Sequence, residues 1–276
     1  MGRSSAFYCT ITGWPNYGRA RLYRLSHVTD AVGYQNLSLD MNYNYAVNTF
    51  VAVGKTKAAM TFGDIGVNAN VTYTSTSIQL LLDNGATATL DIDGLGTVDA
   101  TFTYATTDDG APANGWYLME DAGFEYPQND RVLPLGQGYL VDVSDADAAL
   151  VFAGAVSKDE TEVELAMNYN FTGNCCPKDI TFGDIVPNGN VTYTSTSIQL
   201  LEDNGATATL DIDGLGTVDA TFTYATTDDG APTNGWYLME DAGFEYPQNS
   251  RVLKAGQGVL VDVSDFDATF TFPSAL

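Results

Sequence analysis

Histidine and basic residues are scarce in this chain. Its 276 residues include one histidine, His27, and 11 lysines and arginines against 35 acidic residues, for a formal net charge of −24. Nucleophilic mechanisms of the Ser-His-Asp or Cys-His type need a histidine beside the nucleophile. A strongly acidic surface also repels nucleic acid and anionic membranes. We therefore expect no such catalysis and no nucleic-acid partner.

Cysteines and long apolar runs are also scarce. The three cysteines, Cys9, Cys175 and Cys176, are too few for a disulfide framework or a structural zinc site. No apolar run approaches the roughly 18 residues of a membrane helix, so we expect no membrane insertion. The N-terminus has early arginines but no continuous apolar segment typical of a signal peptide. Export would need a leader outside this sequence or another signal.

What the chain has in abundance is repetition. Residues 61–147 recur 120 positions later as 181–267, and only 10 of these 87 positions differ. The repeat begins earlier, because the MNYN of 41–44 returns at 167–170. A fold copied whole suits a protein that works by repetition, such as a fibre or a multivalent binder. We predict three parts: a basic N-terminal arm and possible donor strand at 1–28, and two homologous β domains at 29–156 and 157–276.

Periodicity and turn residues predict an all-β fold. Side chains alternate with a period of two in segments such as 71–80 and 98–104, and Asp-Gly pairs at 93–94 and 109–110 suit tight turns. Aspartate, which favours turns, far outnumbers glutamate, which favours helices. We expect two tandem β-sandwich or barrel-like domains of about eight strands each. Further strands are predicted at 34–41, 46–53, 86–93, 115–119, 138–143 and 148–153.

The differences between the copies test this interpretation. Leu82 becomes Glu202 beside a predicted turn, which indicates an exposed position. Pro134-Leu135 becomes Lys254-Ala255, which indicates a surface loop. Tyr139 becomes Val259, an exchange between two good strand formers at a loosely packed position.

Several short motifs carry a resemblance. VGY at 32–34 is followed by TFGDI at 61–65, GWYL at 115–118 and LGQGYLV at 135–141. This order resembles uncharacterised β-rich tandem repeats of bacterial secreted and surface proteins, over about residues 29–276. The resemblance implies an extracellular or cell-surface location and a non-catalytic structural role, and it brings no catalytic residues.

The aspartates also offer oxygen ligands for calcium, the one cofactor that the sequence suggests. Hard cations take six to eight oxygens from carboxylates and carbonyls. The alternative for those that precede glycine is turn chemistry, since aspartate commonly caps such turns. The calcium candidates are Asp91, Asp93, Asp99, Asp108 and Asp109, with Asp211, Asp213, Asp219, Asp228 and Asp229 in the second copy.

Aromatic residues near acids could form a sugar-binding platform. The alternative is that the large rings fill the core of a small β domain. A third interpretation makes Glu120, Asp121 and Glu125 a glycosidase carboxylate set, although acids this close together are expected by chance in so acidic a chain. The glycan-contact candidates are Trp116, Tyr126, Trp236 and Tyr246.

Features that occur once point to self-association. Residues 6–12 alternate like a strand and have no counterpart in the repeats, and residues 1–28 carry four arginines and no acid. As a donor strand, this arm would pair with the sheet edge of a neighbouring chain, its arginines meeting the acidic body. Alternatively, it packs on its own chain or is disordered. The self-association candidates are Phe7, Cys9, Ile11, Arg19, Arg21, Arg24, Cys175 and Cys176.

These observations give two expectations for function. The first is a non-catalytic extracellular subunit of a surface layer or fibre, whose main partner is another copy of itself. The alternative is a calcium-assisted carbohydrate-binding or adhesion module, whose partners are glycans.

Overall fold

A computed structural model of the chain confirms the all-β prediction. Strands make up 50% of the structure and helices 7%, none of them with seven or more residues. Within the described residues, no helix is long and apolar enough to cross a membrane. The structure describes residues 32–39, 41–52, 60–73, 75–82, 86–87, 89–91, 97–99, 101–119, 123–144, 148–193, 195–202, 206–207, 209–211, 217–219, 221–239, 243–264 and 267–275.

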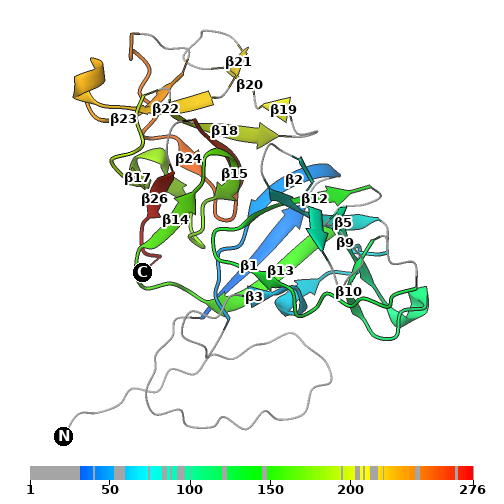
Figure 1. Cartoon of the computed structure of the whole chain (residues 1–276). Coiled ribbons are helices and arrows are strands. Elements are labelled where there is room, and N and C mark those ends of the chain that lie inside the picture. The colour runs from blue at the N-terminus through cyan, green and yellow to red at the C-terminus, as the bar shows by residue number, and fades with distance from the viewer. Residues whose placement is uncertain are drawn as a thin grey trace, which may run out of the picture.

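The two sequence copies form matching series of strands, which gather into two groups (Figure 1). Short 3-10 helices follow equivalent strands in each copy: η1 (Phe62–Asp64), η2 (Thr107–Asp109), η3 (Phe182–Asp184) and η5 (Thr227–Asp229). The strands of the first copy are β1 (Val32–Leu39), β2 (Asn42–Val47), β3 (Met60–Thr61), β4 (Ile65–Val67), β5 (Thr76–Leu82), β6 (Ala86–Thr87), β7 (Thr89–Asp91), β8 (Thr97–Asp99), β9 (Thr101–Ala105), β10 (Gly115–Leu118), β11 (Val132–Leu133), β12 (Gly138–Val143) and β13 (Ala148–Ala155). Those of the second are β14 (Thr161–Leu165), β15 (Asn168–Gly173), β16 (Ile180–Thr181), β17 (Val186–Pro187), β18 (Thr196–Glu202), β19 (Ala206–Thr207), β20 (Thr209–Asp211), β21 (Thr217–Asp219), β22 (Thr221–Ala225), β23 (Gly235–Leu238), β24 (Val252–Leu253), β25 (Gly258–Val263) and β26 (Ala268–Phe272).

Each copy builds a larger and a smaller antiparallel sheet with the same strand order. The larger sheet runs β10-β9-β5-β12-β2 in the first copy, with β6 attached to β5, and β23-β22-β18-β25-β15 in the second, with β19 attached to β18. The smaller sheets are β1-β13-β4 and β14-β26-β17. Strands of one copy pair only with strands of the same copy in these sheets.

A hydrophobic core lies between the two sheets of each copy. In the first copy, Leu150 and Phe152 of the smaller sheet pack in one cluster with Ile78, Phe102 and Val141 of the larger sheet. Leu150 and Phe152 are alternate residues of β13, so both point to the same face of the smaller sheet. Burial itself does not alternate in β12 and β13, where most consecutive residues are buried. An equivalent cluster fills the second copy. The packing is that of a two-sheet sandwich.

The predicted strands are confirmed in part. The strand expected at 71–80 begins only at Thr76, and each copy has thirteen described strands instead of about eight. The prediction for 138–143 coincides with β12, and 148–153 lies within β13. The prediction for 46–53 is displaced, because the strand is β2 at Asn42–Val47 and the chain leaves the sheet at Asn48. The buried Asn48 side chain ends the strand by donating to the carbonyls of Phe50 and Leu133, at 3.0 and 2.8 Å.

The prediction of loose packing at Tyr139 is wrong. Tyr139 is 1% exposed, and Val259 is also buried. The second copy has Phe270 where the first has Leu150, and both positions belong to the core clusters. Compared with the first copy, the core of the second copy thus has a smaller residue at 259 and a larger one at 270.

Candidate functional site

Two equivalent glycines, Gly138 and Gly258, form the centre of a contact between the two copies, here called the joint. Gly138 begins β12, and a Cβ atom there would lie 2.6 Å from the carbonyl carbon of Phe171 in β15. Gly258 begins β25, and its Cβ atom would lie 2.9 Å from the amide nitrogen of Ala46 in β2. Each copy thus brings its glycine against the backbone of the other. Only glycine permits so close an approach.

Hydrogen bonds cross the joint in both directions. The amide of Val47 donates to the carbonyl oxygen of Gly256 at 3.0 Å, and Ala46 forms an antiparallel bridge with Gln257. From the other side, the hydroxyl of Thr172 donates to the carbonyl oxygen of Gly136 at 2.9 Å. The GQG segments at 136–138 and 256–258 therefore contact the opposite copy in an approximately two-fold manner.

Side chains around the GQG segments complete the joint. Leu135 packs against the core cluster of the second copy, and the amide of Gln35 donates to the carbonyl oxygen of Ala255 at 3.0 Å. The Pro134-Leu135 to Lys254-Ala255 change was predicted to mark a surface loop. Pro134 and Lys254 are exposed as predicted, but Leu135 and Ala255 are half-buried at the joint. The copies thus differ where each contacts the other.

The adjacent cysteines do not lie on the surface. Cys175 and Cys176 are each 3% exposed, and both are free thiols. The Cys176 thiol donates to the carbonyl oxygen of Pro273 at 2.8 Å. Burial raises the pKa of Cys175 well above its usual range, and the neighbouring Cys176 raises it further. Their prediction as contacts between chains is corrected, because such a contact needs an accessible thiol. The other predicted contacts, Phe7, Cys9, Ile11, Arg19, Arg21 and Arg24, lie outside the described residues.

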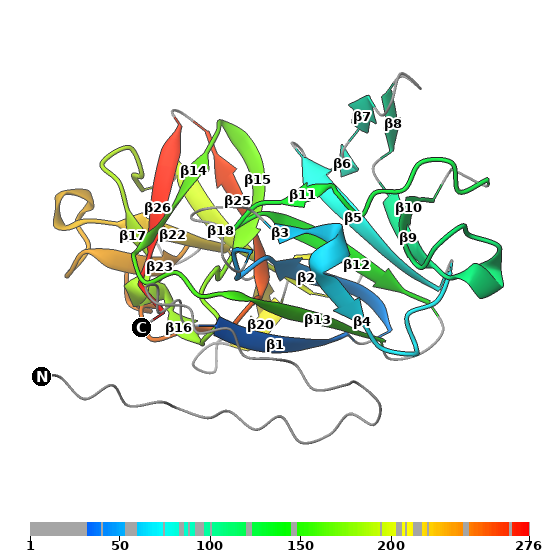
Figure 2. The ribbon, with the colours of Figure 1, turned by 90° about the horizontal axis from the view of Figure 1, so that it is seen from below.

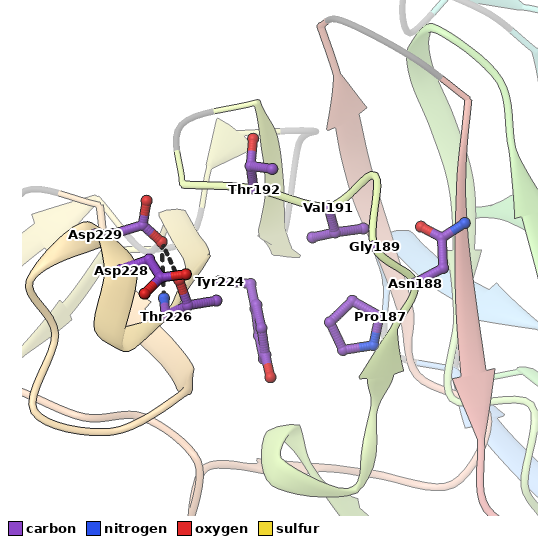
Figure 3. Close-up of a pocket in the computed structure, with 9 residues that line it drawn as sticks. All are labelled: Pro187, Asn188, Gly189, Val191, Thr192, Tyr224, Thr226, Asp228 and Asp229. Atoms are coloured by element: carbon purple, nitrogen blue, oxygen red, sulfur yellow. Dashed lines mark hydrogen bonds between the residues drawn. The ribbon is translucent and has the colours of Figure 1, made fainter.

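A pocket of about 390 Å³ lies in the second copy, between the end of β17 and the segment after β22. Figure 3 shows Tyr224 between the Thr226–Asp229 segment on one side and Pro187 on the other. Two lining residues, Pro187 and Gly189, replace Val67 and Ala69 of the first copy. The full lining is Pro187, Asn188, Gly189, Val191, Thr192, Tyr224, Thr226, Asp228 and Asp229.

The pocket brings together two of the predicted calcium ligands, but one of them caps a turn. Asp229 accepts hydrogen bonds from the amide and the hydroxyl of Thr226, both at 2.8 Å. Its counterpart Asp109 is held in the same way by Thr106, whose hydroxyl and amide lower the pKa of that carboxyl. The turn interpretation is therefore confirmed for these two aspartates.

Of the calcium candidates, only Asp228 and Asp229 line the pocket. Asp108 and Asp228 are exposed residues of η2 and η5. Asp91 and Asp99 lie on the paired strands β7 and β8, as Asp211 and Asp219 do on β20 and β21, and Asp93 and Asp213 lie outside the described residues. Among the residues that the structure describes, no three acidic, histidine or cysteine side chains are placed to share a metal ion.

The predicted glycan platform is corrected at its two tryptophans. Trp116 is 1% and Trp236 0% exposed, and each ring packs in the core against a phenylalanine, Phe62 or Phe182. A buried ring cannot stack on a sugar, so the core alternative is confirmed for both. Tyr126 and Tyr246 are half-buried, and Tyr246 packs beside the second core cluster.

Sequence reasoning missed the joint, although its signal is present. The GQG tripeptide occurs once in each copy, and its glycine pair is typical of a turn. Gly136 and Gly256 do lie in turns with positive φ, and the first and last glycines also contact the other copy. No family model, curated protein or solved structure matches the chain. The resemblance to bacterial surface repeats accordingly stays a prediction.

Proposed function

We propose that this protein is a non-catalytic structural subunit of an extracellular layer or fibre, in which each chain contributes a tandem β block that associates with further chains. The observation that carries the proposal is the joint. Two near-identical copies contact each other through backbone at Gly138 and Gly258, so the tandem forms one block rather than two tethered units.

The sequence supports the non-catalytic part of the proposal. The single histidine, His27, precedes both copies, so neither copy contains a histidine-based catalytic set. Export is supported by the acidic composition and by the resemblance to surface repeats. A charge of −24 keeps single chains soluble and limits association to surfaces where like charges do not meet.

Negative-stain imaging of the purified full-length chain tests this function. We expect extended assemblies with a regular repeat at high protein concentration and physiological salt. Single particles of one chain at every concentration and salt would contradict the proposal. A variant with Gly138→Val and Gly258→Val, which opens the joint, is expected to lose the regular repeat.

The pocket favours one alternative, a calcium-assisted carbohydrate-binding module. Its volume of about 390 Å³ lies in the range of small-ligand sites, and Tyr224, Asn188 and Asp228 offer an aromatic face and polar groups. Glycan-array binding that is lost with Tyr224→Ala, and a calcium-dependent rise in the melting temperature that is lost with Asp228→Asn, would favour this alternative. The equivalent changes Tyr104→Ala and Asp108→Asn in the first copy are the matched controls.

A further inference from the structure

The outer face of the smaller sheet in the first copy carries no charged side chain. Val32 and Tyr34 of β1 are 65% and 69% exposed, the highest values among the exposed large hydrophobic residues. The remaining positions of this face alternate with the core positions along β1, β13 and β4. They are Asn36, Ser38, Ala149, Val151, Ala153, Ala155 and Gly66, of which Ala149 and Ala155 are buried. This face is therefore uncharged although the chain carries a net charge of −24.

The equivalent face of the second copy is acidic. Asn36 and Ser38 correspond to the exposed Glu162 and Glu164 of β14. Before β14 begins, Tyr34 corresponds to Glu160 and Val32 to Lys158, both exposed. The copies are nearly identical over residues 61–147, yet here they differ at every position of the edge strand's outer face. The asymmetry separates the two edges: acidic side chains protect β14 from strand addition, whereas β1 has no such protection.

The edge of β1 is open among the residues that the structure describes. β1 is the outermost strand of the sheet β1-β13-β4, and all eight of its residues pair with β13 on one side only (Figure 2). No described backbone group outside that pair hydrogen-bonds to β1. An antiparallel strand that pairs on one side presents its alternate N–H and C=O groups on the other.

We propose that β1 is a docking edge for β1 of a second copy of this chain, so that two smaller sheets join across a two-fold axis. The inference rests on the proposed self-association and names its contact. In an antiparallel pair, opposed residues lie on the same face. Val32, Tyr34, Asn36 and Ser38 of one chain therefore face only the same four residues of the other chain. No charged side chain of one β1 lies opposite a charged side chain of the other.

The same pairing is unfavourable for the second copy. If β14 paired with β14 of another chain, Glu162 and Glu164 would face the same two glutamates, and like charges directly opposite destabilise a strand pair. Pairing of β1 with β14 would bring exposed tyrosine and asparagine against glutamates. Since two chains of charge −24 repel over most of their surfaces, the uncharged β1 edge is where they can approach most closely.

Sedimentation equilibrium of the full chain tests the contact. We expect a reversible dimer of the 29.5 kDa chain. The variant Asn36→Glu with Ser38→Glu copies the charges of β14 onto β1 and should raise the dimer dissociation constant at least about tenfold. The control Val132→Glu with Val252→Glu adds the same charge and removes two exposed valines elsewhere, and it should dimerise like the wild type.

A mixing experiment separates pairing from misfolding. The variant Asn36→Lys with Ser38→Lys should also be monomeric alone, while an equal mixture with the glutamate variant should dimerise. Independently of any variant, hydrogen exchange of the β1 amides in the wild type should slow as protein concentration rises.

Several results would overturn the proposal: a wild type that stays monomeric, a glutamate variant that dimerises normally, or β1 exchange that is independent of concentration. A dimer that persists in the glutamate variant but disappears on deletion of residues 1–28 would assign the contact to the arm instead. A contact with two-fold symmetry uses the same edge of both chains, so it joins two chains and does not by itself extend into a fibre. Isolated dimers without extended assemblies would therefore support this contact and contradict the proposed fibre.

Discussion

The hydroxyl of Thr172 in the second copy donates a 2.9 Å hydrogen bond to the carbonyl oxygen of Gly136 in the first. Thr172 is 2% exposed, so this bond is made away from solvent. The first copy has Ala46 at the equivalent position, where the bridge to Gln257 uses backbone alone. One side of the joint thus has a side-chain bond that the other lacks.

Removing that hydroxyl should weaken the joint. Thr172→Ala leaves the Gly136 carbonyl without its partner and should lower the free energy of unfolding by about 1 kcal/mol. Thr172→Ser keeps the hydroxyl and should cost less. Urea denaturation of both variants measures the difference. Equal stability of the alanine variant and the wild type would show that this hydrogen bond does not hold the copies together.

A methyl group at Gly138 should be costly, because its Cβ would lie 2.6 Å from a backbone carbon of Phe171. We expect Gly138→Ala to lower the free energy of unfolding by about 1–3 kcal/mol. Gly189→Ala is the matched control, since a Cβ there has no atom within 4 Å and the first copy already has Ala69 at this position. Similar melting temperatures for the two variants would contradict the close approach at the joint.

The buried thiols should resist modification until the chain opens. In a Cys9→Ser background, a thiol reagent reports only on Cys175 and Cys176, whose pKa values are raised by burial. We expect labelling about two orders of magnitude slower than in denaturant, because it requires opening of the structure. Rapid labelling of the folded chain would contradict the burial of these cysteines and would make them accessible for contacts between chains.

Asp142 and Asp262 should make stability depend on pH. Each lies half-buried in β12 or β25, and burial raises the pKa of each carboxyl. The folded state therefore favours the protonated form, and stability falls as pH rises from the unfolded pKa, about 3.9, through the raised folded value. The double variant Asp142→Asn, Asp262→Asn should therefore lose less stability than the wild type as pH rises over this range. Identical slopes of melting temperature against pH would contradict the assignment.

The fold was predictable because strand alternation is a local property. Phe102 lies in the core cluster and Tyr104, two residues further on, packs against it, as the period of two predicts for residues on one face. The role of Asp109 in a turn is likewise predictable from neighbouring residues, since glycine follows it and a threonine precedes it by three residues.

The joint and the cysteines were not predictable in the same way. Whether Gly138 forms a turn or meets Phe171 depends on how two distant segments pack, and a single sequence does not state that pairing. The burial of Cys175 and Tyr139 also depends on long-range packing. A difference between copies indicates tolerance at a position, and it does not distinguish exposure from burial, since Tyr139 and Val259 are both buried.

Differential scanning calorimetry tests most directly whether the two copies act as one block. Near-identical copies would melt at similar temperatures even when independent, so the comparison of enthalpies is decisive rather than the number of peaks. If the joint couples the copies, the van't Hoff enthalpy should equal the calorimetric enthalpy of the whole chain. A van't Hoff enthalpy of about half the calorimetric value would mean two independent units and would contradict the account.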